Sequence, residues 1–333
     1  MKNYDIIGDI HGSLDKLIDL LHTLGYRGEI PQHPEGRQAV FVGDLIDRGP
    51  GEAQLAIVRL VKAMVDAGSA IAVMGNHEFN ALAYATPLED GSPYYCRPHD
   101  NHHNREKHAD FLSLSDNERQ ECYDFFYSMP LWAELDGVRV IHACWHQPTI
   151  DEVAKRLGGN RLRGADDIRA ASDRDDPLYA DIELLLKGPE KLIIDLTGAP
   201  FYDKEGIARE AARFRWWKSA GDYLIDYLEL GDPSQLGEEF NLEALRETPV
   251  DHQHLYNSTI PVVFGHYWRQ RDADDPAWAP HLDDTCTDVT ACVDFSAVMG
   301  GPLVAYRFNA GDTRIKGENY VVGSLATPSS SSN

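Results

Sequence analysis

Short strand-like runs alternate with amphipathic stretches over the first 85 residues of the chain. The runs at 4–7, 38–42 and 69–74 each end in glycine followed by aspartate or asparagine. Between them, aliphatic residues recur at helical spacing over 14–24 and 53–65. This order predicts βαβ units with parallel strands and right-handed crossovers. Because ligands bind at the carboxyl ends of such strands, the polar residues at these three ends are the first candidates for chemistry.

The rest of the chain carries further segments in a less regular order. A helix is predicted over 115–129, because Ser115 and Glu118 have the spacing of a capping box. The stretch from 86 to 110 is polar and rich in Pro, Asn and His, which predicts a loop. Residues 151–247 are expected to be mostly helical. Four more strands are predicted, at 137–142, 259–264, 290–295 and 302–308.

Charge narrows the range of partners. Acidic side chains outnumber basic ones by 54 to 31, which gives a formal net charge of −23. This charge argues against binding to nucleic acid or to an anionic membrane through a broad basic face. A small, locally positive site remains compatible with this charge, and 43% hydrophobic residues are enough for a well-filled core.

The compartment is inferred from the lack of long apolar stretches and from the number and spacing of the cysteines. Residues 1–7 lack the apolar stretch of a signal peptide, and no window approaches 18 uninterrupted apolar residues. The five cysteines are odd in number and form no C-x-x-C pair. We therefore expect a cytoplasmic protein with reduced thiols, without a membrane partner. The oligomeric state is left open.

Polar residues of three kinds stand where predicted strands end. Carboxylate, amide and imidazole donors together suit Mn²⁺, Fe or Zn²⁺. The set is larger than a four-coordinate site needs, so two ions that share a bridging carboxylate explain it best. The candidate ligands are Asp9, His11, Asp44, Asn76, His142 and His266.

Three motifs in this region carry a resemblance to a known family. Residues 8–12 resemble the pattern G-D-x-H-G, residues 43–49 resemble G-D-x-x-D-R-G, and residues 75–78 resemble G-N-H-E. Together they resemble the calcineurin-like metallophosphoesterase superfamily, in its phosphoprotein-phosphatase branch. The run 5–12, with residues 33–37 before the second motif, is most similar to bacterial PrpE-like phosphatases and diadenosine tetraphosphatases.

The resemblance implies a fold and a domain plan. It implies an α/β fold, namely a four-layer α/β/β/α sandwich with a helical, cap-like insertion. We expect one catalytic domain over 1–326 that contains a mostly helical insertion over about 147–255. This insertion is expected to cap the site and to select the substrate. Residues 327–333 are expected to form a flexible serine-rich tail.

The resemblance also assigns the candidate ligands. Asp9, His11 and the bridging Asp44 would hold one divalent ion, and Asp44, Asn76, His142 and His266 would hold the other. Mn²⁺ is the first choice of metal, with Fe, Zn²⁺ or Ni²⁺ as alternatives.

Further residues are assigned to catalysis and to phosphate binding. The resemblance makes His77 the general acid for the leaving oxygen, with Asp47 to orient it and keep it protonated. Arg48 would grip phosphate oxygens in its planar fork. The family needs a second phosphate-binding arginine, for which Arg213 and Arg215 are the candidates.

The expected activity is hydrolysis of phosphomonoesters, by attack of a metal-bridging hydroxide on a phosphoprotein or a small phosphorylated metabolite. Gly265-His266-Tyr267-Trp268 lacks the second histidine of the G-H-x-H motif common in phosphodiesterases, which favours a phosphatase-type site. The alternative is hydrolysis of dinucleoside polyphosphates such as diadenosine tetraphosphate; phosphodiester hydrolysis is more remote. An inactive scaffold that kept the fold is the alternative from another class.

Two features are expected to be structural. His99, His102, His103 and His108 are irregularly spaced, so we expect a solvated loop instead of a further metal site. Glu78 is expected to be an ordinary first-turn residue that the helix dipole favours, and it is left out of the ligand set.

Overall fold

The computed structural model forms two compact units. The first comprises Met1–Leu186 with Thr259–Asn333, and the second comprises Lys187–Ser258. The residues that the structure describes are 2–89, 108–202, 206–218, 220–230, 236–269 and 286–323. The predicted tail at 327–333 lies outside them.

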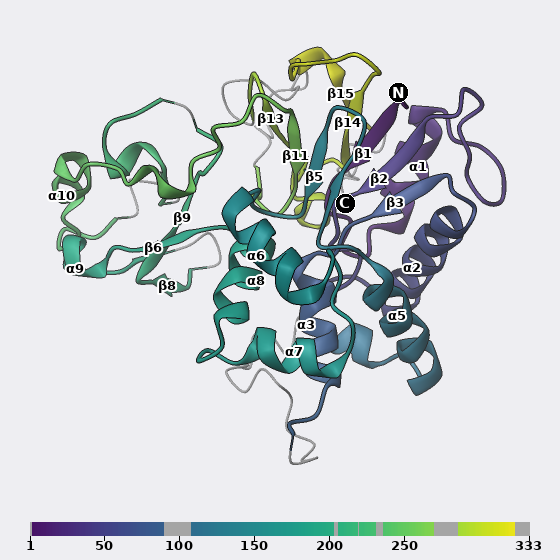
Figure 1. Cartoon of the computed structure of the whole chain (residues 1–333), viewed down its shortest axis with the longest axis horizontal. Coiled ribbons are helices and arrows are strands. Elements are labelled where there is room, and N and C mark those ends of the chain that lie inside the picture. Colours follow the sequence, from purple (N-terminus) through teal and green to yellow (C-terminus); the bar gives the residue numbers. More distant parts are fainter. Residues whose placement is uncertain are drawn as a thin grey trace, which may run out of the picture. The chain divides into compact units, whose positions relative to one another are not determined.

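A five-stranded sheet in the first unit contains the three strands predicted near the start of the chain. Its order is β15-β14-β1-β2-β3, and β1, β2 and β3 run parallel, as predicted. Because they run parallel, their carboxyl ends lie at the same edge of the sheet (Figure 1). The strands are β1 Tyr4–Ile7, β2 Gln38–Phe41, β3 Ala70–Ala72, β14 Val304–Phe308 and β15 Tyr320–Val322.

A second five-stranded sheet in the same unit has the order β12-β13-β11-β5-β4. Its central strand β11 runs parallel to both β5 and β13, so their carboxyl ends also lie together. Short antiparallel strands close both edges. The strands are β4 Trp132–Glu134, β5 Arg139–Ile141, β11 Val262–Phe264, β12 Cys286–Thr287 and β13 Thr290–Cys292.

The hydrophobic core lies between these two sheets. Ile6 and Val40 of the first sheet and Val140, Val263 and Ala291 of the second are all fully buried and belong to one cluster. Burying a valine or isoleucine side chain contributes about 1.5–3 kcal/mol, so this layer supplies much of the stability of the unit. Two sheets that face each other across such a core, with helices outside them, form the α/β fold that the sequence predicts.

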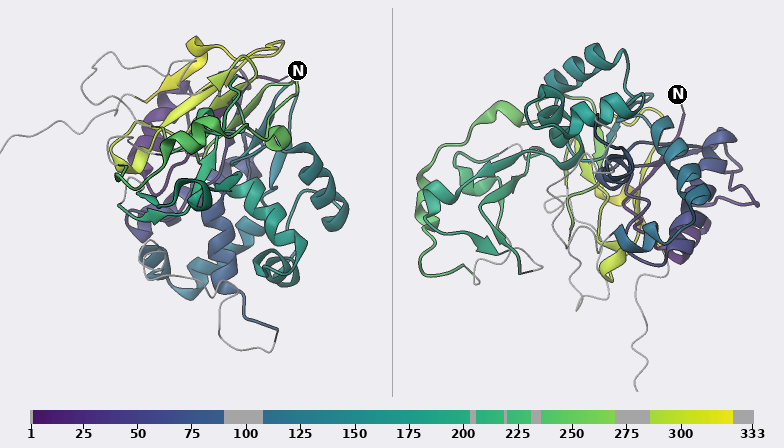
Figure 2. Two further views of the ribbon diagram at one scale, coloured as in Figure 1. Left: turned by 90° about the vertical axis from the view of Figure 1, so that its left-hand side faces the viewer. Right: turned by 90° about the horizontal axis from the view of Figure 1, so that it is seen from below.

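Helices join and flank these strands. α1 contacts β15, and α2 packs against β3, so both cover the first sheet (Figures 1 and 2). α5 begins after Ser115, whose side chain and that of Glu118 form the predicted capping box. The helices of this unit are α1 Leu14–Leu24, α2 Gly51–Asp66, α3 Asn76–Ala85, α5 Asp116–Ser128, α6 Gln147–Leu157, α7 Ala165–Ser172 and α8 Pro177–Lys187.

The described part of the second unit combines short strands with short helical segments, whereas the sequence predicts mostly helix there. Within 147–255, long helices are confined to α6, α7 and α8. The expectation of a mostly helical insertion therefore fits only its first part. The reason is that strands of two to four residues are too short to show a period-2 pattern. The elements are β6 Glu190–Leu192, α9 Ile194–Thr197, β7 Phe201–Tyr202, β8 Ala208–Arg209, β9 Ala211–Phe214, β10 Leu228–Glu229 and α10 Leu242–Glu247.

No helix among the described residues is both long enough and apolar enough to span a bilayer.

A buried ion cluster ties β1 to its two neighbouring strands. Asp5 of β1 is fully buried and accepts hydrogen bonds from Arg37 Nε at 3.1 Å, Arg307 Nε at 2.9 Å and Tyr26 Oη at 3.2 Å. Arg37 is itself buried, and its Nη2 also donates to the Tyr4 carbonyl at 2.7 Å. The arginine of the 33–37 segment therefore has a structural role here.

Replacing Asp5 with asparagine should destabilise the protein strongly. The change leaves the buried Arg37 charge without its carboxylate, and breaking a buried pair costs about 3–5 kcal/mol of unfolding free energy. Urea denaturation followed by circular dichroism measures this loss. Asp66→Asn is the matched control, because Asp66 forms an exposed pair with Lys62, which contributes at most about 1 kcal/mol. Equal losses in both variants would contradict the prediction.

Candidate active site

The candidate ligands follow the carboxyl ends of five strands. Three of these strands run parallel in the first sheet, and two run parallel in the second. Five of the residues at this edge have left-handed backbone angles, which side chains other than glycine rarely adopt. Such strain concentrates at functional sites, because the surrounding structure must hold it. These residues are His11 at φ 45°, Asp44 at φ 52°, Asp47 at φ 60°, Arg48 at φ 69° and His266 at φ 63°.

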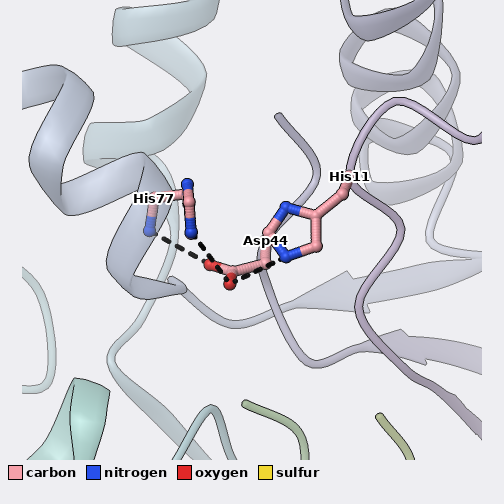
Figure 3. Close-up of side chains that lie close together, drawn as sticks. All are labelled: His11, Asp44 and His77. Carbon is pink, nitrogen blue, oxygen red and sulfur yellow. Dashed lines mark hydrogen bonds and ion pairs between the residues drawn. The ribbon is translucent and has the colours of Figure 1, made fainter. Parts of the chain in front are cut away.

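One group of donor atoms consists of His11, Asp44 and His77, which lie within 4.8 Å of one another. Asp44 Oδ2 is 3.4 Å from His11 Nε2 and 3.8 Å from His77 Nε2. The backbone N–H of His77 also donates to Asp44 Oδ1 at 3.0 Å. Figure 3 shows both imidazole rings beside the Asp44 carboxylate. A carboxylate between two imidazoles is a common metal-binding arrangement.

A second group shares Asp44 and adds His142 and His266. His142 Nε2 lies 3.5 Å from Asp44 Oδ2 and 3.0 Å from the amide oxygen of Asn76. His266 Nδ1 lies 2.9 Å from the same amide oxygen. The structure thus brings together the four residues that the sequence predicts for one ion, with Asp44 common to both groups.

Two of the histidines are oriented from behind by backbone carbonyls. His11 Nδ1 lies 2.9 Å from the Ile46 carbonyl, and His142 Nδ1 lies 2.8 Å from the Val42 carbonyl. A ring that donates through Nδ1 presents the lone pair of Nε2 to the site, as metal ligands do. Burial and the nearby His77 lower the pKa of His11 to about 4, which keeps this ring neutral.

Asp9 is placed differently from its predicted partners. It lies outside both groups of three, and its Oδ2 accepts the backbone N–H of His266 at 3.1 Å. Burial, together with the charges of Asp294 and Asp44, raises the pKa of Asp9 well above its usual range. The buried Asp294, which follows β13, is a neighbour of the site that the sequence analysis missed.

Glu78 has a larger role than that of an ordinary first-turn residue. It is fully buried, and its carboxylate accepts the N–H groups of Asp44 at 2.8 Å, Leu45 at 2.8 Å and Gly75 at 3.0 Å. It therefore fixes the corners that follow β2 and β3 relative to each other. No local pattern could have revealed contacts across 33 and 34 positions of the chain.

His77 forms the predicted pair with Asp47. His77 Nδ1 lies 2.6 Å from Asp47 Oδ2, and the Asp47 N–H donates to the buried Gln54 Oε1 at 2.9 Å. Burial alone would lower the pKa of His77, but the carboxylates of Asp44 and Asp47 outweigh it and raise the pKa to about 9. The ring is therefore protonated at pH 7, as a general acid must be.

His108 was expected in a solvated loop, and this expectation is wrong. Residues 108–112 are helical, and the His108 side chain is 2% exposed. Its Nδ1 lies 2.6 Å from Asp47 Oδ1, so Asp47 contacts two histidines. The prediction failed because a segment of polar composition can still contain one buried residue. His99, His102 and His103 lie outside the described residues.

The three candidate phosphate-binding arginines belong to different units of the chain. Arg48 follows Asp47 and is half-buried, and its Nη1 lies 3.4 Å from Met299 Sδ, beside an exposed methionine. Arg213 lies on β9, and Arg215 follows it within the second unit. Arg215 Nη2 donates to the carbonyls of Asp226 at 2.9 Å and Leu228 at 3.1 Å. A phosphate-binding role for Arg213 or Arg215 stays a prediction.

The charges of the site fit divalent cations. Burial and the charge of Asp44 raise the pKa of Glu78 to about 7, and Asp9 is raised as well. Negative charge on these buried carboxylates is therefore costly, first through burial and then through their mutual repulsion. Cations bound among them would relieve this cost, and the donor set suits Mn²⁺, Fe or Zn²⁺.

Comparison with known proteins identifies the family of the chain and relatives that match a short stretch of it. The model of the calcineurin-like phosphoesterase family matches residues 3–267. The bis(5'-nucleosyl)-tetraphosphatase PrpE [asymmetrical] of Halalkalibacterium halodurans is 51% identical over 77 residues, which are 22% of this chain and 30% of that protein. The chain thus matches less than a third of the length of this relative.

Solved structures with a similar arrangement are more distant. A putative diadenosine tetraphosphatase has a TM-score of 0.43 at 18% identity, over 97% of this chain and 94% of the other. A protein serine/threonine phosphatase from Saccharomyces cerevisiae has a TM-score of 0.46 at 14% identity, over 96% of this chain and 78% of the other.

Proposed function

Since the chain belongs to the calcineurin-like phosphoesterase family, we propose that it is a dinuclear metal-dependent phosphatase that hydrolyses phosphomonoesters. The observation that carries the proposal is the Asp44 carboxylate, which belongs to both groups of donor atoms. A shared carboxylate is what two neighbouring cations require. The substrate class that we propose is a phosphopeptide or a small phosphorylated metabolite.

The residues that would hold the cations follow from the two groups. His11 and Asp44 would hold one cation together with Asp9, and Asp44, Asn76, His142 and His266 would hold the other. Two such cations supply Lewis acidity that polarises phosphoryl oxygens and lowers the pKa of water. We propose Mn²⁺ as the first choice, with Fe, Zn²⁺ or Ni²⁺ as alternatives.

The chain's own residues would handle the substrate and the proton. His77 donates to Asp47 through Nδ1, so its Nε2–H is the proton that can pass to the leaving oxygen. Arg48, half-buried next to Asp47, would bind phosphate oxygens through its fork of N–H groups. Asp47 keeps the His77 ring oriented and charged, as its 2.6 Å contact requires.

A second candidate function is hydrolysis of dinucleoside polyphosphates. It is favoured by the activity in the name of the relative that is 51% identical over 77 residues. The same residues would bind and protonate this substrate. The only change is that the leaving group is a nucleotide phosphate in place of an alcohol. Since the two activities share fold and site, only substrates can separate them.

A substrate panel tests both candidates. Protein purified without chelator should contain about two metal ions per chain and should be activated by Mn²⁺. We expect turnover of phosphopeptides or p-nitrophenyl phosphate to exceed turnover of diadenosine tetraphosphate and of a bis-aryl phosphodiester. Faster turnover of the tetraphosphate would support the second candidate. Absence of both metal and turnover would contradict the dinuclear phosphoesterase.

A further inference from the structure

The Asp47 carboxylate is held at both oxygens by different histidines. Oδ2 contacts His77 Nδ1 and Oδ1 contacts His108 Nδ1, each at 2.6 Å. The backbone N–H of Asp47 is held separately by Gln54. Rotation of the carboxylate would therefore break both imidazole contacts at once. Its orientation toward His77 depends in part on the contact that it makes with His108.

His108 is itself fixed by its surroundings. Its ring stacks on Phe111 with centroids 5.0 Å apart and lies 5.4 Å from the ring of Tyr84. Phe111 and Tyr84 are buried, and His108 is 2% exposed. An imidazole locked between aromatic rings holds one orientation, so it can act as a rigid hydrogen-bond donor.

The hydrogen bonds also indicate which ring nitrogen of His108 carries a hydrogen. Burial raises the pKa of Asp47, but its bonds to His108 and His77 outweigh this and lower the pKa below its usual range, so the group accepts hydrogen bonds as a carboxylate. His108 Nδ1 must then carry a hydrogen. Its Nε2 is buried without a hydrogen-bond partner in the described part of the chain. The bond to Asp47 is therefore the hydrogen bond that holds this ring among the described residues.

We propose that His108 is a positioning residue that donates a hydrogen bond to Asp47 and thereby holds Asp47 in the orientation that aligns His77. His77, Asp47 and His108 form a chain in which the outer histidine orients and the inner one exchanges the proton. The catalytic consequence rests on the proposed function, whereas the chain of hydrogen bonds does not.

Two substitutions at 108 separate donation from packing. His108→Leu removes the donor and keeps an apolar side chain, whereas His108→Asn keeps an N–H group near the place of Nδ1. We expect the leucine variant to lower kcat about tenfold or more on an alkyl phosphate, with KM unchanged. Its effect on p-nitrophenyl phosphate should be small, because that leaving group needs little protonation. The asparagine variant should recover most of the lost rate.

Phe111→Leu is the matched control for packing. It removes the ring that stacks on His108 but makes no polar contact with Asp47 in the described structure. We expect it to lower the melting temperature but to change the ratio of alkyl to aryl turnover much less than His108→Leu does, because the Nδ1–H donor to Asp47 remains. If this ratio changed as much as in His108→Leu, or if His108→Asn recovered nothing, the positioning role would be overturned.

A measurement without turnover keeps the inference testable if the proposed function fails. Proton NMR of protein labelled with ¹⁵N-histidine and supplied with diamagnetic Zn²⁺ should include two low-field ring N–H signals from His77 and His108, whose partner is a carboxylate, beside those of rings that donate to backbone carbonyls. His108→Leu should remove one and move the other, and Phe111→Leu should keep both. An unmoved His77 signal in His108→Leu would contradict the proposal, whatever the enzyme hydrolyses.

Discussion

Asp44→Asn is expected to lower turnover of every substrate at least about 100-fold. Asp44 Oδ2 lies within 3.4–3.8 Å of imidazole nitrogens from His11, His77 and His142, so it belongs to both groups of donors. Loss of a partner outside the ligand shell already costs about 10–100-fold, and loss of a shared ligand should cost more. Metal content should fall from about two ions per chain toward one or none.

Stability distinguishes this loss from misfolding. The asparagine side chain retains an oxygen that can accept the His77 N–H, as Asp44 Oδ1 does at 3.0 Å. The substitution also removes a charge that raises the pKa of Asp9 and Glu78. Asp44 also stabilises the charged His77 ring, so these effects oppose each other, and chelator-treated Asp44→Asn should remain folded with a free energy of unfolding close to that of the unmodified chain. Asp66→Asn, at an exposed ion pair, should change neither metal content nor turnover. Near-normal turnover by Asp44→Asn would contradict the bridging role.

The positions of the ligand candidates were predictable because strand direction determines them. Each candidate follows an apolar run, and parallel strands bring their carboxyl ends to the same edge. The local pattern therefore located Asp44 and His142 although they lie far apart in sequence. The pairing of His77 with Asp47 followed from the resemblance, and the structure places their ring nitrogen and carboxylate 2.6 Å apart.

The supporting residues were not predictable, because their roles depend on contacts across the fold. Glu78 binds backbone N–H groups 33 and 34 positions away, and His108 contacts Asp47 across 61 positions. The composition around Glu78 indicates only a helix start, and the composition around His108 indicates a solvated loop. The second unit was mispredicted for a different reason, since short strands such as β7 and β10 carry no recognisable alternation.

His77→Asn should lower turnover about 10²–10⁴-fold for alkyl phosphates, and much less for p-nitrophenyl phosphate. An alkoxide is a poor leaving group that needs the proton, whereas p-nitrophenolate leaves without it. Because the pKa of His77 is raised to about 9, the acid form is present at pH 7 and is lost as pH rises through that value. Alkyl phosphate turnover by the unmodified protein should therefore fall at high pH more than aryl phosphate turnover.

The same variant decides between two readings of the His77 ring. His77 Nε2 lies 3.8 Å from Asp44 Oδ2 and is part of a possible metal-binding group, so the ring could serve as a ligand or as an acid. If it is an acid, metal content in His77→Asn stays at about two ions per chain and only the dependence on the leaving group changes. If it is a ligand, metal is lost and all substrates slow together. Burial lowers the pKa of His77, but the charges of Asp44 and Asp47 raise it to about 9, and this favours the acid, because a protonated ring has no Nε2 lone pair for a cation.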